Sequence, residues 1–89
     1  MPIRTVAVAS SVGLHARPAA LLASAVNESG LDVTVALPGG DPVDAGSILE
    51  VMTLGAEHGD TVTLSADGDG ADGVLDSLVE LLSRDLDKE

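Results

Sequence analysis

The chain has 89 residues, contains no Cys, Trp, Tyr or Phe, and carries 15 acidic against 4 basic residues, a net charge of −11. This length fits a single domain over residues 1–89, and the absence of Cys excludes disulfides and thiolate chemistry. The negative charge disfavours binding to nucleic acid or to an anionic membrane. No apolar run approaches the about 20 residues of a membrane span, and the N-terminus lacks a signal-peptide pattern.

The first third of the chain predicts a strand followed by a helix. Ile3 to Ala9 alternates like a strand, and a turn follows at residues 10–13. Ala16 to Ser29 predicts a helix, because Pro18 falls in its first turn and Gly30 stands where a C-terminal cap belongs. The apolar stripe of this helix consists of Ala19, Leu22, Ala23 and Val26.

The middle of the chain predicts a hairpin and a short helix. Leu31 to Leu37 alternates as a strand, residues 38–41 form a turn, and Pro42 to Ala45 completes the hairpin as an edge strand, since Pro cannot donate to a ladder. Ser47 and Glu50 match the S-x-x-E capping box, so a helix should start at Ser47 and end near residues 54–55.

The last third predicts a strand and a long helix. Thr61 to Ala66 alternates cleanly, and Ala71 to about Leu86 has a broad apolar face. The loop over residues 67–72 superficially resembles a calcium loop, but Leu78 stands where the bidentate Glu would be, so no metal site is expected. His58 lies in a turn and is read as solvated.

The predicted order β-α-β-β-α-β-α indicates an α+β fold. One four-stranded antiparallel sheet with three helices on one face buries every apolar surface. The first strand, first helix and second strand form a right-handed crossover, which leaves a slot for the last strand between them.

His15 and Arg17 are the residues best placed for chemistry. His15 comes just before a predicted helix, whose N-terminus stabilises an attached anion, and imidazole is a good nucleophile near neutral pH. Arg17 is a cation in a first turn that would ordinarily favour acids, so it indicates a bound dianion. The alternative is that His15 merely caps the helix and Arg17 is a solvated charge.

Residues 13–19, Gly-Leu-His-Ala-Arg-Pro-Ala, resemble the active-site signature of the HPr family, the histidine-containing phosphocarriers of the sugar phosphotransferase system. Residues 47–55, Ser-Ile-Leu-Glu-Val-Met-Thr-Leu-Gly, resemble the regulatory-serine and partner-contact segment of that family. The length and element order also match, so the resemblance covers essentially the whole chain.

The resemblance implies an open-faced β-sandwich and a phosphorylation cycle. Enzyme I, phosphorylated by phosphoenolpyruvate, would donate a phosphoryl group to Nδ1 of His15, and enzyme IIA domains would receive it. Arg17 and the backbone N–H groups of Ala16 and Arg17 would bind the phosphoryl group. No cofactor or metal is implied. The chain would act in the cytoplasm as a monomeric carrier and not as a stand-alone enzyme.

The second block carries a regulatory and a contact hypothesis. Ser47 is expected to cap its helix, and the resemblance also makes it a candidate regulatory phosphorylation site. At least two of Ile48, Leu49 and Met52 should be exposed and form a partner surface. An alternative function is a regulatory docking module switched by phosphorylation of His15 or Ser47, and another is a structural interaction domain without phosphoryl chemistry.

The chain departs from the family pattern in two ways. Val12 stands where many relatives have a small polar residue near the phosphoryl group. The basic residues that many relatives place around the site are also missing. The positions concerned are Ser24, Asn27, Ala45 and Glu50.

Overall fold

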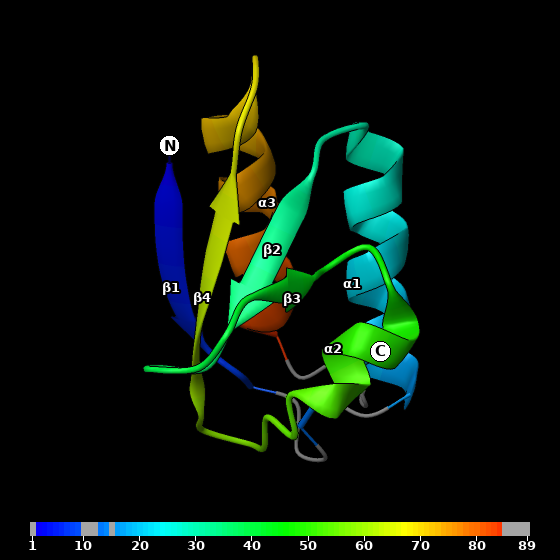
Figure 1. Ribbon diagram of the computed structural model, residues 1–89, viewed down its shortest axis with the longest axis vertical. Coiled ribbons are helices and arrows are strands. Elements are labelled where there is room, and N and C mark those ends of the chain that lie inside the picture. The colour runs from blue at the N-terminus through cyan, green and yellow to red at the C-terminus, as the bar shows by residue number, and fades with distance from the viewer. Residues whose placement is uncertain (1, 10–12, 15, 85–89) are drawn as a thin grey trace.

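The computed structural model describes residues 2–9, 13–14 and 16–84, which form one four-stranded antiparallel sheet and three helices (Figure 1). The elements are β1 (Ile3–Ala7), α1 (Ala16–Ser29), β2 (Val33–Ala36), β3 (Val43–Asp44), α2 (Ile48–Thr53), β4 (Thr61–Ala66) and α3 (Ala71–Leu82).

The strand order β1-β4-β2-β3 confirms the predicted topology. β4 fills the slot between β1 and β2 and is antiparallel to both, with Val6 opposite Val62 and Val35 opposite Leu64. β3 pairs only with β2 in the described sheet, as expected of an edge strand that follows Pro42.

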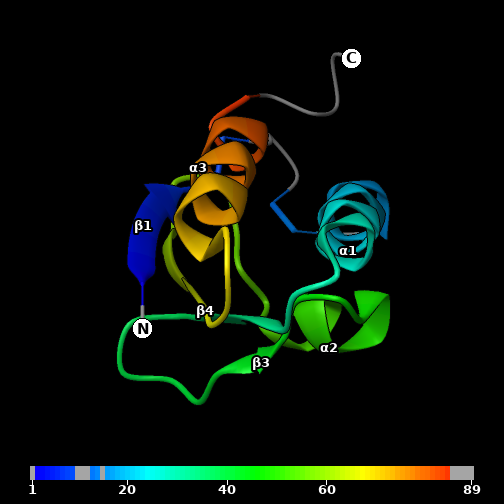
Figure 2. The same ribbon diagram turned by 90° about the horizontal axis from the view of Figure 1, so that it is seen from above.

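One face of the sheet is buried under the helices and the other is open (Figure 2). The alternation of β4 explains this, because Val62, Leu64 and Ala66 are buried while the residues between them are not. Helix α1 buries Pro18 and the four residues of its predicted stripe, and α3 buries Leu75, Leu78 and Leu82. The core is therefore entirely aliphatic.

Three of the predicted strands were longer than the strands in the structure. β1 ends at Ala7 and not at Ala9, because the N–H of Val8 donates to the Asp60 carbonyl (2.9 Å) and that of Ala9 to the Leu82 carbonyl (3.1 Å), outside the sheet ladder. β2 and β3 are also shorter than the alternating segments that contain them.

The last helix is also shorter than predicted. α3 ends at Leu82, because Ser83 is its C-cap and the N–H of Arg84 bonds three residues back to Leu81 (3.3 Å), which tightens the final turn. Leu86 lies outside the described residues.

Arg4 ties β1 to α3 in a way that the sequence pattern did not indicate. Its Nε lies 2.9 Å from a carboxylate oxygen of Asp76, and its Nη2 lies 3.0 Å from one of Asp72. The guanidinium of Arg4 donates these hydrogen bonds, and the carboxylate of Asp76, followed by that of Asp72, raises the pKa of Arg4 above its usual value. One of the four basic residues is thus engaged at the α3 end of the sheet.

Candidate functional site

The segment around the candidate acceptor is held on both sides. His15 and Val12 lie outside the described residues, but Leu14 before His15 is 3% exposed. After His15, Pro18 and Ala19 at the start of α1 are also buried. The described residues on both sides of His15 are therefore anchored in the core.

Gly13 and Leu14 are fixed against the loop that follows α2. The N–H of Leu14 donates to the carbonyl oxygen of Ala56 (2.9 Å). Gly13 has a φ of 73°, and a Cβ built on it would collide with that carbonyl and lie 2.8 Å from the Cα of Glu57. Only glycine fits this conformation and this approach. The glycine of the sequence motif therefore sets the path of the chain two residues before His15.

The first turn of α1 is suited to an anion. Ala16 and Arg17 are exposed at the start of this 14-residue helix, and no acidic residue occurs in its first turn. The first N–H groups of a helix have no intrahelical acceptor and carry partial positive charge. This end of α1 therefore offers backbone donors to an anion, and binding of a phosphoryl group by Arg17 stays a prediction.

Helix α2 is positioned by a hydrogen bond from α1. The side-chain amide of Asn27 donates to the carbonyl of Ala23 (2.9 Å) within α1 and to that of Gly46 (3.1 Å) in the approach to α2. A Cβ built on Gly46 would lie 3.4 Å from Cγ1 of Val26 on α1. Asn27, read from the sequence only as a missing base, thus helps to hold the second motif beside the first.

Ser47 caps α2, as predicted, but the capping box is only half formed. The Ser47 hydroxyl accepts from the backbone N–H of Glu50 (3.4 Å). The N–H of Ser47 instead donates to the Asp44 carbonyl (3.1 Å), and the Glu50 carboxylate accepts from the N–H of Asp44 (3.4 Å). The turn at residues 44–47 therefore already gives the Ser47 N–H an acceptor, so Glu50 does not bond to it. Regulatory phosphorylation of Ser47 stays a prediction.

The apolar patch expected on α2 is exposed. Ile48, Leu49 and Met52 are 43%, 77% and 40% exposed, whereas Val51 on the same helix is fully buried. A six-residue helix can bury only one side, so three large apolar side chains remain outside. We call Ile48, Leu49 and Met52 the α2 patch. Its exposure is confirmed, and its contact with a partner stays a prediction.

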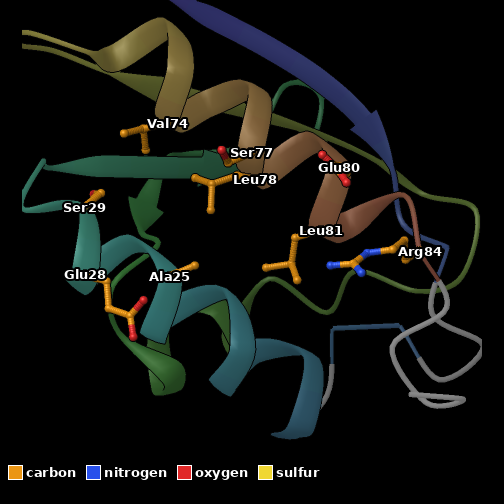
Figure 3. A pocket seen from close by; sticks show the side chains of 9 residues that line it. All are labelled: Ala25, Glu28, Ser29, Val74, Ser77, Leu78, Glu80, Leu81 and Arg84. Carbon is orange, nitrogen blue, oxygen red and sulfur yellow. The ribbon is translucent and has the colours of Figure 1, made fainter.

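A groove of about 460 Å³ lies elsewhere, between α1 and α3. Figure 3 shows Leu78 and Leu81 reaching from α3 into the space between the two helices, with Ala25 on α1. Its described lining includes neither Arg17 nor any residue of α2. The groove is therefore distinct from the surface that the two sequence motifs indicate.

The described residues contain neither a cluster suited to a metal ion nor a helix suited to a membrane. His58 is exposed in the turn before β4, and no three His, Cys, Asp or Glu residues of the described part come together where they could hold a metal ion. None of the helices in that part is long and apolar enough to cross a membrane.

Comparison with known proteins gives consistent matches. The sequence model of the family described as "PTS HPr component phosphorylation site" matches residues 3–84. The phosphocarrier protein HPr of Streptomyces coelicolor is 40% identical over 88 residues, which cover 99% of this chain and 95% of that protein. That of Haloferax volcanii is 42% identical over 81 residues, 90% of this chain and 91% of that protein.

Solved structures match equally well. The crystal structure of HPr-C-His from Thermoanaerobacter tengcongensis superimposes with a TM-score of 0.85 at 35% identity, covering 92% of this chain and 91% of that one. HPr from Bacillus anthracis gives 0.85 at 31% identity, covering 91% and 95%. The fold and the sequence thus point to the same set of proteins.

Proposed function

Because this chain belongs to the HPr family of phosphotransferase-system phosphocarriers, we propose that it accepts a phosphoryl group from phosphorylated enzyme I on His15 and passes it to enzyme IIA domains. The observation that carries the proposal is the motif at residues 13–19, whose described members flank His15 as a close-packed loop and an exposed helix N-terminus.

The transfer needs no chemistry beyond two exchanges of one phosphoryl group. In the first, a lone pair on Nδ1 of neutral His15 attacks phosphorus, the N–P bond forms, and the bond from phosphorus to its atom on enzyme I breaks. In the second, a nucleophile of the IIA domain attacks, and the electron pair of the N–P bond returns to His15. The carrier contributes position and electrostatic stabilisation.

The residues around His15 serve these two contributions. Gly13 and Leu14 hold the backbone that precedes His15 against the backbone of Ala56. This contact limits the conformations from which transfer starts. The N–H groups at Ala16 and Arg17 and the Arg17 guanidinium face negative charge on the phosphoryl oxygens. The exposure of Ala16 and Arg17 at the start of α1 and the absence of acidic residues from its first turn support these roles.

The proposal includes the setting of the reaction. The carrier acts in the cytoplasm as a monomer, in a system for sugar uptake, and meets both partners through the first turn of α1 and the α2 patch. The exposure of Ile48, Leu49 and Met52 beside α1 supports this surface. Exposed apolar groups of this kind mark protein-contact sites.

The direct test is phosphorylation with purified enzyme I and phosphoenolpyruvate, followed by intact-mass measurement. The chain should gain one phosphoryl group and lose it when an enzyme IIA domain is added. The control omits phosphoenolpyruvate. A parallel reaction with another HPr shows that enzyme I is active. If the mass of this chain does not change with that active enzyme I, the proposal is wrong.

A further inference from the structure

The α2 patch is bordered by carboxylates. Glu50 is exposed on α2 itself, and its carboxylate oxygen lies 3.4 Å from the backbone nitrogen of Asp44. Asp44 is also exposed, and its carboxylate accepts from the N–H of Gly46 (2.8 Å). Both charges are therefore held by backbone donors at the start of the helix that carries the patch.

A third carboxylate belongs to the loop that follows α2. Glu57 is exposed, and its Cα is among the atoms that a Cβ on Gly13 would strike, so its backbone adjoins the segment that leads to His15. The N–H of Glu57 is held by the carboxylate of Asp60 (2.9 Å). Exposed acidic residues thus occur in the turn before α2, on α2 itself and in the loop after it.

Among the described residues, few basic side chains accompany these carboxylates. Arg4 is bound by Asp72 and Asp76 on α3, Arg84 follows the end of α3, and Lys88 lies outside the described residues. Arg17 alone among the four bases belongs to the first turn of α1. The net charge of −11 adds a long-range negative field.

We propose that the α2 patch and its acidic border bind a partner surface that has an apolar centre and a rim of Lys or Arg; this inference rests on the proposed function and specifies the docking face of the phosphoryl donor. Leu49 supplies the apolar anchor, and Glu50 and Glu57 face basic side chains. An acidic partner surface would place like charges together, which opposes association.

The test measures binding of the full chain to enzyme I from the same organism by titration calorimetry. Glu50→Gln removes the charge and keeps an oxygen that can accept from the N–H of Asp44. Glu57→Gln removes the charge of a residue in the loop after α2. Asp69→Asn is the matched control, because Asp69 is exposed in the loop before α3, at the other end of β4 from the α2 side (Figure 1).

Near 20 mM salt, each Glu→Gln change should weaken binding about two- to fivefold, whereas Asp69→Asn should leave it nearly unchanged. The differences should fade near 0.5 M salt, where the screening length falls below about 5 Å. Unchanged or tighter binding of both Glu variants at low salt would overturn the inference.

Intact-mass measurement separates this outcome from failure of the proposed function. If the function is right and only the charge inference is wrong, enzyme I still phosphorylates the wild-type chain and both Glu variants. If the function itself is wrong, none of these proteins is phosphorylated.

Discussion

Gly13 lies so close to the backbone of Ala56 that a side chain of any size at this position would meet the Ala56 carbonyl oxygen. The same oxygen accepts a 2.9 Å hydrogen bond from the next residue, Leu14. This contact joins the loop before His15 to the loop after α2, so the first sequence motif meets, through backbone atoms, the loop that directly follows the second motif.

Gly13→Ala should therefore damage both stability and transfer. Gly39→Ala is the matched control, because Gly39 has a φ of 74° against 73° for Gly13 but has nothing within 4 Å of a built Cβ. In the control, the free energy of unfolding should fall only by the about 1–2 kcal/mol that a left-handed conformation costs an alanine. In Gly13→Ala it should fall by more. Urea unfolding and the rate of phosphorylation check this. Equal losses and equal rates in the two variants would contradict it.

His15→Ala should abolish phosphorylation by enzyme I, and His58→Ala should not. A phosphoryl group on an imidazole nitrogen is a phosphoramidate, so the label on the wild-type chain should be lost in acid and kept in base. Intact mass after each treatment measures this. Label that persists in the His15 variant would place the acceptor elsewhere.

Arg17→Ala should slow phosphoryl transfer substantially while changing the free energy of unfolding by less than about 0.5 kcal/mol, because the residue is exposed. Arg84→Ala is the control, because it also removes one positive charge, but from a residue that follows α3. This variant should transfer the phosphoryl group faster than Arg17→Ala. Rapid-quench kinetics with phosphorylated enzyme I would compare them. Transfer at the wild-type rate by Arg17→Ala would show that its charge is not used.

Leu49→Ala should weaken binding to enzyme I by more than about 1 kcal/mol if this residue anchors the contact. Its side chain is 77% exposed, so the stability of the free chain should hardly change. Ile3→Ala is the control, because Ile3 is 54% exposed on β1, across the sheet from β3 and α2. Comparable binding by both variants would show that Leu49 does not contribute to the interface.

The charge of −11 should make the fold more stable as salt rises. Raising NaCl from about 20 to 500 mM should increase Tm by about 5 °C, which corresponds to about 1 kcal/mol in a domain of this size. A variant with Asp41→Lys and Asp69→Lys changes the charge by +4, from −11 to −7. It should melt higher at low salt and gain less from NaCl; a wild-type Tm that ignores salt would contradict the argument.

The sequence alone determined the elements whose signals are local. Thr61–Ala66 and Ala16–Ser29 were predicted with the bounds that the structure has, because alternation and a 3.6-residue stripe are properties of neighbouring residues. The exposure of at least two of Ile48, Leu49 and Met52 was also predicted, because a short helix cannot bury every apolar residue. The motif around His15, at residues 13–19, indicated the family by itself.

Tertiary structure alone decided which distant groups meet. The Arg4–Asp76 pair joins residues 72 positions apart, and Asn27 reaches Gly46 across 19 positions. Glu50 has Asp44 as its partner and not the Ser47 N–H that the capping pattern predicted, because the turn before α2 already uses that donor. Periodicity describes one element at a time, whereas these contacts depend on how the chain brings separate elements together.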